Sequence, residues 1–305
     1  MKQTRSISSN EMLKSIMRLM CIFSLFALIC DILDLFFEDT TSVEAVYDIL
    51  HFIQYFTVIF FLFRHKINLE ELHIYRKSLS IKNIFISLLI GFFTSALGSS
   101  LDELMPKIPT VDGDYSFIHT ILFMFFAGIM APIFEEIEFR GLLFRSLKGR
   151  MQTVFAILLS SLMFMVLHTG GILISAFIVG IISAIVFLWT NNLIYSMLIH
   201  FAGNSIAVMM IALSLIIPMS TNDVSDSVNE TIETSSFWAP EMIVLNLLPA
   251  AILFVLLIFL YKRTNHSQSD TKLELVNEKM DYSILPYFIF YFVICVGSTI
   301  AQFVI

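Results

Sequence analysis

Long apolar runs follow one another along almost the whole chain, separated by shorter polar connections. Each run approaches the 20 or so residues that a helix needs to cross the hydrocarbon core of a bilayer. We therefore predict an all-α fold, a polytopic transmembrane helix bundle of about nine spans, with eight spans as the alternative. The predicted spans cover residues 19–37, 46–63, 84–101, 116–137, 153–168, 172–189, 193–217, 242–261 and 282–303.

Basic residues are confined to alternate connections between these runs. Residues 1–18, 64–82, 138–150 and 262–281 hold 17 of the 18 Lys and Arg residues, and only Lys107 lies elsewhere. The opposite connections are acidic. Because cytoplasmic loops of membrane proteins carry an excess of Lys and Arg, this pattern predicts a cytoplasmic N-terminus and an external C-terminus. The short polar tails and the absence of a eukaryotic sorting signal favour a bacterial plasma membrane.

The composition agrees with a membrane protein and changes the expected domain count. The chain has 305 residues, of which 57% are hydrophobic and 14% charged, and its mean hydropathy is +0.85. A soluble domain carries about a quarter charged residues. We predict a single integral membrane domain over 1–305, with an external acidic loop at 219–241 and a cytoplasmic loop at 262–281. Membrane lipid is an expected partner, and nucleic acid is not.

The first apolar run resembles a signal peptide because basic residues precede it. No A-x-A cleavage pattern follows, however, and acidic residues come directly after Cys30. An uncleaved first span is the better interpretation. The three cysteines, Cys21, Cys30 and Cys295, lack the spacing of a metal site or a disulfide framework, and we expect them to be small buried side chains.

Three predicted spans carry ionisable or amide side chains at membrane depth, where such groups are costly and usually face the bundle interior or a wet cavity. Counting about 1.5 Å per residue from the basic ends places Glu135 about 20 Å deep, His168 at most about 27 Å, and His200 and Asn204 about 12 and 18 Å. These depths predict one shared polar site in the cytoplasmic half of the bilayer, approached from the cytoplasmic side.

Helical spacing separates the roles of the charges in "EEIEFR", residues 135–140. Glu136 and Arg140 are four residues apart in the favourable order, so they can pair along one face and stay charged. Glu135 is rotated by about 100° and lacks that partner. A free carboxylate, two histidines and an amide around a wet pocket suffice to bind and polarise a water molecule.

The same residues carry a family resemblance. "EEIEFR" (135–140), "FMVLH" (164–168) and "HFAGN" (200–204) resemble the motifs EExxxR, FxxxH and HxxxN of the CPBP family. That family contains type II CAAX prenyl proteases together with bacteriocin-processing and bacteriocin-immunity proteins, also called Abi. The three motifs occur in order on successive deep helices, in a core that covers about 116–217.

The resemblance implies an intramembrane endopeptidase. By that resemblance Glu135 activates the water, His168 is a second acid/base group, and His200 and Asn204 stabilise the oxyanion or hold the water. The same comparison makes the remaining motif residues structural: Glu136 and Arg140 brace the helix, and Phe164 packs beside the site.

Two chemical questions stay open at this stage. The family is labelled metalloprotease, and a zinc ion held by Glu135, His168 and His200 is chemically possible; the sequence lacks H-E-x-x-H, and we favour a mechanism that requires no metal cofactor. Glu138 departs from the family pattern. Three residues from Glu135, it could line a wet entrance, share a proton with Glu135, or belong to a different chemistry.

Two classes of function fit these features. The first is a protease that cleaves a membrane-associated peptide or protein, such as a bacteriocin-like or signalling peptide. The alternative is a non-hydrolytic bacteriocin-immunity or secretion-accessory membrane protein that keeps the polar site for binding. Retention of every motif residue favours the protease. A transporter is a weaker third possibility, since the chain shows no repeated halves.

Overall fold

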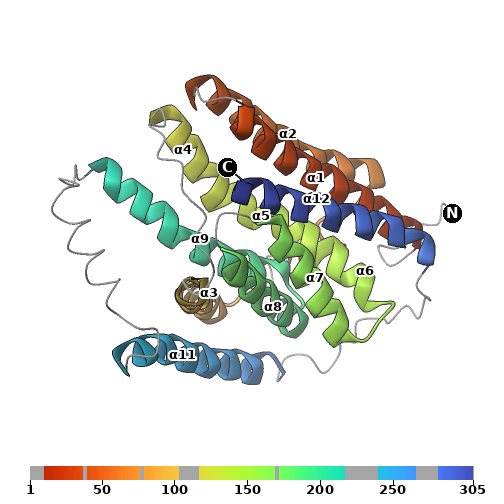
Figure 1. Cartoon of the computed structure of the whole chain (residues 1–305). Coiled ribbons are helices and arrows are strands. Elements are labelled where there is room, and N and C mark those ends of the chain that lie inside the picture. The colour runs from red at the N-terminus through yellow and green to blue at the C-terminus, as the bar shows by residue number, and fades with distance from the viewer. Residues whose placement is uncertain are drawn as a thin grey trace.

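The chain forms a bundle of helices, seen in a computed structural model (Figure 1). The structure describes residues 10–36, 40–75, 79–102, 117–168, 172–216, 240–265 and 281–304. Within these ranges all regular structure is helical, which confirms the predicted all-α class. The helices are α1 (Asn10–Phe36), α2 (Thr40–His65), α3 (Ile81–Asp102), α7 (Thr153–Leu167), α8 (Leu173–Thr190), α9 (Leu193–Ile216), α11 (Pro240–Asn265) and α12 (Leu285–Val304), the last preceded by a 3₁₀ turn, η4 (Tyr282–Ile284).

The fourth predicted span is a continuous but irregular helix. It consists of α4 (Phe117–Phe125), a π-helical turn η2 (Phe126–Met130), α5 (Ala131–Glu136), a π-helical segment η3 (Ile137–Phe144) and α6 (Arg145–Lys148). Two π-helical segments in one helix are uncommon and tend to occur at functional sites. Every motif residue of "EEIEFR" lies in α5 or η3, so the irregular backbone and the candidate chemistry coincide.

Several helices are long and apolar enough to cross a membrane. Among the described residues five satisfy this criterion, within Ile81–Asp102, Phe117–Lys148, Leu173–Thr190, Leu193–Leu213 and Leu247–Thr264. Large apolar side chains on outward faces, such as Phe56, Phe85 and Phe254, are exposed as lipid-facing residues would be. The chain is a multi-pass membrane protein. The number of nine spans and the orientation stay predictions, and most of the loops at 219–241 and 262–281 lies outside the described residues.

Close helix packing depends on small residues. The backbone of α3 at Gly91 lies against the Ile199 carbonyl of α9, where a Cβ atom would clash. A Cβ atom on Gly180 of α8 would lie 2.9 Å from the Cβ atom of Ser161 on α7. Small residues allow such close approach in membranes, where helix association relies on packing and polar contacts.

The helix ends gather into two opposite ends of the bundle. The end that we call the basic end holds the start of α1, α3, α7, α9 and α12; there Lys14 Nζ of α1 lies 2.8 Å from Asp281 Oδ2, just before α12. Figure 1 shows α1 and α12 side by side from this end. Segment 66–75 closes it: the Leu193 amide donates to the His73 carbonyl at 2.9 Å, and the Asn192 amide side chain donates to the Tyr75 carbonyl at 2.9 Å. We call the other end the far end.

A carboxylate from one helix caps another at the far end. Asp102, the last residue of α3, accepts hydrogen bonds from the Ile174 amide at 2.7 Å and the Ser175 amide at 3.2 Å, and from the Ser175 hydroxyl. These donors lie in the first turn of α8, whose own N-cap residue supplies no side-chain bond. Asp102 therefore satisfies amide groups that the helix leaves unpaired.

We expect Asp102→Ala to lower the free energy of unfolding by about 1–2 kcal/mol, the usual cost of losing a helix cap. Denaturant unfolding in detergent micelles would measure it. Asp102→Asn is the matched control, because its amide oxygen still accepts one of these bonds, and it should cost less. Equal stability of the alanine variant and the wild type would contradict this account.

The closure of the basic end contains a histidine that acid should destabilise. His73 Nδ1 donates to Asn191 Oδ1 across 2.6 Å, and both residues have positive φ angles. Burial, with the nearby positive charge of Arg145, lowers the pKa of His73 from 6.5 to about 4. In the unfolded chain His73 therefore binds a proton near pH 6.5, whereas in the folded chain it binds one only near pH 4. Stability should be full above pH 6.5 and fall as the pH drops toward 4.

Unfolding free energies measured between pH 7 and pH 4 test this expectation. His73→Asn is the control variant, because asparagine tolerates a positive φ and does not titrate. The wild type should lose stability over this range more steeply than His73→Asn. Parallel pH profiles would show that His73 does not contribute.

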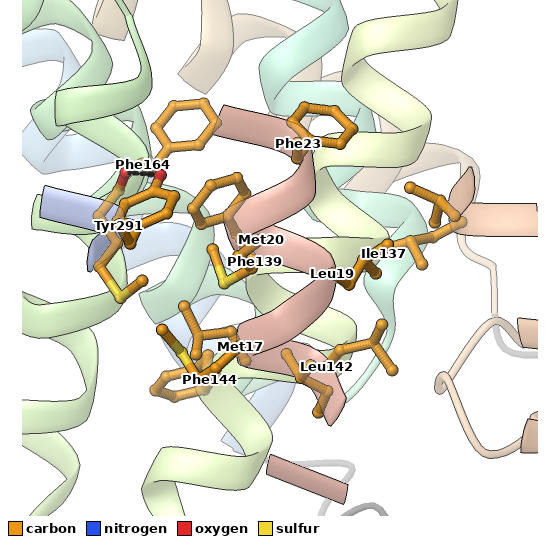
Figure 2. Close-up of a cluster of buried hydrophobic side chains, with 14 of the residues drawn as sticks. Met17, Leu19, Met20, Phe23, Ile137, Phe139, Leu142, Phe144, Phe164 and Tyr291 are labelled. Carbon is orange, nitrogen blue, oxygen red and sulfur yellow. Dashed lines mark hydrogen bonds between the residues drawn. The ribbon is translucent and has the colours of Figure 1, made fainter. Parts of the chain in front are cut away.

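Among the residues that the structure describes, two hydrophobic clusters form the core. The larger one joins α1, η3, α7 and α12, and Figure 2 shows its centre, where Met17, Met20 and Phe23 of α1 face Phe139 and Phe144 of η3. The smaller cluster joins α3, α8, α9 and α11. The candidate site lies where the helix that carries the "EEIEFR" motif contacts α7 and α9.

Candidate active site

Glu135 of α5, His168 at the C-terminal end of α7 and His200 of α9 come together, as the depth count predicted. Glu135 Oε2 lies 3.8 Å from His168 Nε2 and 3.9 Å from His200 Nε2. Both gaps are too long for a direct hydrogen bond. The Oε2 atom is buried and has no hydrogen-bond partner among the described residues. One small polar molecule between these three atoms could hydrogen-bond to all of them.

The predicted Glu136–Arg140 pair is present and fully buried. Arg140 Nη1 lies 3.1 Å from Glu136 Oε1, and the Arg140 guanidinium carbon lies 4.4 Å from the centre of the Phe164 ring. A cation over an aromatic face is favourable where water is excluded. Phe164 also contacts both imidazoles, with ring centres 4.5 Å from His168 and 5.5 Å from His200. It thus packs beside the site as predicted.

The two histidines are oriented by different partners. His168 Nδ1 donates to the Phe164 carbonyl at 2.8 Å, and because a carbonyl only accepts, this nitrogen carries the proton. His200 Nδ1 donates to Glu136 Oε1 at 3.2 Å. In both residues Nε2 is the atom that faces Glu135. The bond from His200 to Glu136 links the catalytic candidates to the buried ion pair, a connection that spacing within single helices did not predict.

His168 differs from its predicted place in one respect. The predicted span 153–168 includes it, whereas α7 ends at Leu167 and His168 is extended, with φ −90° and ψ 140°. The backbone amide of His168 donates to the Met165 carbonyl. If the α-helix continued, this amide would bond the Phe164 carbonyl, which instead accepts a hydrogen bond from the His168 imidazole. The side chain therefore caps the helix while it points Nε2 toward Glu135.

Asn204 is held by the irregular backbone of the helix that runs from α4 to α6 and carries Glu135, which we call the motif helix. Its side-chain amide donates to the Ala127 carbonyl at 2.8 Å. In the π-helical turn each carbonyl bonds the amide five residues on, as Phe126 does with Ala131. The fifth residue after Ala127 is Pro132, which has no N–H group. Asn204 therefore fills a bond that proline leaves open, and its second N–H is not used in this bond.

These four residues line one cavity of about 520 Å³. Apolar and aromatic side chains form most of its wall, and Tyr55 and His51 of α2 contribute polar groups. Its exposed lining residues, Ser99, Phe123, Ile172 and Ala207, all lie toward the far end. The expected approach from the basic end is therefore wrong for this cavity. Segment 66–75 closes that end by packing Leu72 into the core beneath it.

Glu138 is buried away from the cavity. Its side chain is fully inaccessible, it is absent from the lining residues, and neither carboxylate oxygen has a hydrogen-bond partner among the described residues. The hypothesis that it lines a wet entrance is wrong. The wider π-helical turn that begins at Ile137 changes the rotation per residue, so counting three residues from Glu135 along an α-helix gives the wrong face.

The zinc site suggested by the sequence can be compared with this geometry. Tetrahedral zinc, with bonds of about 2.0–2.1 Å to nitrogen and oxygen, holds its ligand atoms about 3.3 Å apart. The nearest oxygen–nitrogen distances in the site are 3.8 and 3.9 Å. Within the described ranges no group of three His, Cys, Asp or Glu side chains is placed to hold a metal ion. The residues do not fit zinc in this arrangement, and no step of the reaction is derived through it.

Comparison with known proteins points to the same segment. Residues 117–206 match the family model described as type II CAAX prenyl endopeptidase Rce1-like. This segment of the chain is similar to that family, and it contains the three motifs that resemble those of the CPBP family. A relative in Staphylococcus aureus (strain USA300), the membrane-embedded CAAX protease MroQ, is 33% identical over 94 residues. That similarity covers 28% of this chain and 38% of the relative, so the chain matches well under half of the relative's length. No solved structure matches the chain.

The matched segment, 117–206, contains the three motifs and excludes α1, α2 and α3, which also border the cavity. Phe26, Tyr55 and Ser95 come from these helices. Sequence analysis missed them because a single Tyr or Ser in an apolar helix carries no motif. An unusual concentration of polar residues on one face of α2, His51, Gln54 and Tyr55, was the one available signal.

Proposed function

We propose that the chain is an intramembrane endopeptidase that hydrolyses a peptide bond in a membrane-associated peptide or protein. The observation that carries this proposal is the position of Glu135 Oε2 between the Nε2 atoms of His168 and His200 inside the cavity. A buried carboxylate with two imidazoles suits general acid–base chemistry. The CPBP match to the same segment supports a peptide as substrate.

The two histidines present different groups to Glu135. Glu135 and Glu136 are neighbouring carboxyl groups, and Arg140 pairs with Glu136. His200 lies between the two carboxylates, with Nδ1 3.2 Å from Glu136 Oε1 and Nε2 3.9 Å from Glu135 Oε2. When both of its ring nitrogens carry protons, His200 presents an N–H group from Nε2. Neutral His168, with its proton on Nδ1, presents a lone pair from Nε2.

The reaction then needs one water molecule between Glu135 and His168. Glu135 accepts a proton from this water molecule while the water oxygen forms a bond to the carbonyl carbon of the substrate. The electron pair of the C=O double bond moves to oxygen, and the His200 Nε2–H and the free N–H of Asn204 stabilise the oxyanion. When the carbonyl re-forms, the C–N bond breaks and the amine takes the proton from Glu135, assisted by His168. The products are one carboxylic acid and one amine.

The cavity wall indicates which bond is presented. None of its lining residues is Lys or Arg, so it offers no cation for a C-terminal carboxylate. Its largely apolar wall and far-end mouth fit an internal bond next to an apolar segment. If the basic end is cytoplasmic, the mouth faces the external side, which suits an exported peptide of bacteriocin-like or signalling type.

Cleavage of a fluorogenic peptide library by purified protein in detergent tests this function. We expect internal bonds to be cut, and the rate to be unchanged by a chelator. A rate that the chelator abolishes and zinc restores would make Glu135 a metal ligand. No cleavage by the wild type, with bacteriocin protection retained in a Glu135→Gln strain, would favour the non-hydrolytic immunity protein.

A further inference from the structure

We infer that Tyr55 is an additional catalytic residue, whose hydroxyl donates a hydrogen bond to the oxyanion that forms on the substrate carbonyl. The inference rests on the proposed function. Tyr55 lies on α2, outside the segment 117–206 that matches the CPBP family, so no motif assigns it a role.

Tyr55 shares the cavity with the four motif residues. It is 5% exposed and lines the same wall as Glu135. A residue far away in sequence is thus part of the surface that a substrate would touch.

The Tyr55 ring is held by the helix that carries Glu135. It stacks on Phe134, with ring centres 5.2 Å apart and planes at 29°, and on Phe126, at 6.0 Å and 27°. Phe23 of α1 adds an edge contact at 6.3 Å. Because Phe134 directly precedes Glu135, the phenol and the carboxylate have a fixed relation. Such a pre-organised donor costs no reorganisation during the reaction.

The aromatic contacts explain why a ring is needed at Tyr55, but they do not explain why this ring carries a hydroxyl group. Two other buried tyrosines form hydrogen bonds through their hydroxyl groups. The Tyr291 hydroxyl donates to the Met163 carbonyl at 2.6 Å (Figure 2), and the Tyr195 hydroxyl accepts from the Ser80 amide at 2.9 Å. No hydrogen bond of the Tyr55 hydroxyl is found within the described part of the chain, and this oxygen is not among the fully buried oxygens that lack a partner, so it is open to the cavity that Tyr55 lines. A hydroxyl group that is open to a cavity and has no protein acceptor is an available donor for a ligand in that cavity.

The site also needs another donor. One N–H of Asn204 is committed to the Ala127 carbonyl, which leaves this amide with one N–H for the substrate. His200 offers an N–H from Nε2 only when protonated, since its Nδ1 proton is directed at Glu136. A tyrosine hydroxyl is a neutral donor that adds no charge beside Glu135, Glu136 and Arg140.

The test compares the wild type with Tyr55→Phe, which keeps the aromatic stacking and removes the hydroxyl. Loss of one oxyanion donor lowers kcat by about 100-fold. We expect that fall with KM within about threefold of the wild type. A peptide ketone that binds as a tetrahedral hydrate should lose affinity by the same factor as kcat, whereas an uncleaved substrate analogue should not. The control is Tyr291→Phe, which should lower the unfolding temperature and leave kcat within about threefold.

Each outcome is distinct from failure of the proposed function. Unchanged kcat and unchanged ketone affinity in Tyr55→Phe, in a protein that Glu135→Gln inactivates, would overturn the role of Tyr55 alone. Equal loss of affinity for ketone and substrate analogue, with a lower unfolding temperature, would show a structural role and also overturn it. No cleavage by the wild type would remove the proposed function, and the inference about Tyr55 with it.

Discussion

Replacing Glu135 by glutamine is expected to lower kcat by about 10³-fold or more, because the amide cannot take a proton from water. The variant should fold, since Glu135 Oε2 makes no hydrogen bond within the described structure and glutamine has the same shape. Initial rates of peptide cleavage, with thermal unfolding of the same preparations, measure both properties.

Glu138→Gln is the matched control for this variant. It removes a carboxyl group from the same motif helix, and that group is buried outside the cavity. We expect its kcat to stay within about threefold of the wild type. Comparable losses in the two variants would contradict the assignment of Glu135 as the base and suggest that the two carboxyl groups share a proton.

Arg140→Met should destabilise the protein more than loss of the helix cap at Asp102. It leaves the buried Glu136 carboxylate without its guanidinium partner and removes the cation that lies 4.4 Å from the Phe164 ring centre. Breaking one side of a buried ion pair costs about 3–5 kcal/mol. Denaturant unfolding in micelles measures the change in free energy.

The double variant Glu136→Gln with Arg140→Met is the control for this effect. It removes both charges, so no uncompensated carboxylate remains, and we expect it to be more stable than Arg140→Met alone. Its kcat should still fall, because His200 loses the acceptor that orients Nδ1. A single variant that unfolds within about 1 kcal/mol of the wild type would contradict the bracing role of the pair.

Much of the site follows from distances within single helices. The pairing of Glu136 with Arg140 depends on a spacing of four residues, and η3 keeps it at 3.1 Å despite its π-helical form. The meeting of Glu135, His168 and His200 follows from counting residues between helix ends. Such features depend on the rise per residue, which varies little between helices.

Features that depend on how helices rotate and how loops pack could not be predicted in this way. The bond from His200 to Glu136 requires the relative rotation of α9 and the motif helix. The entrance direction depends on segment 66–75, which closes the basic end through contacts such as the one between His73 and Leu193. Tyr55 enters the cavity because α2 packs beside Phe126 and Phe134, a contact between segments about 70 to 80 residues apart.

The most direct test of the account is cleavage of a membrane-anchored peptide by the wild type in proteoliposomes prepared in H₂¹⁸O. We expect mass spectrometry to show cleavage at an internal bond, one ¹⁸O atom in the new carboxyl terminus of the product, and no product with Glu135→Gln. No cleavage, a new terminus without ¹⁸O, or equal labelled product from Glu135→Gln would contradict a water molecule activated by Glu135.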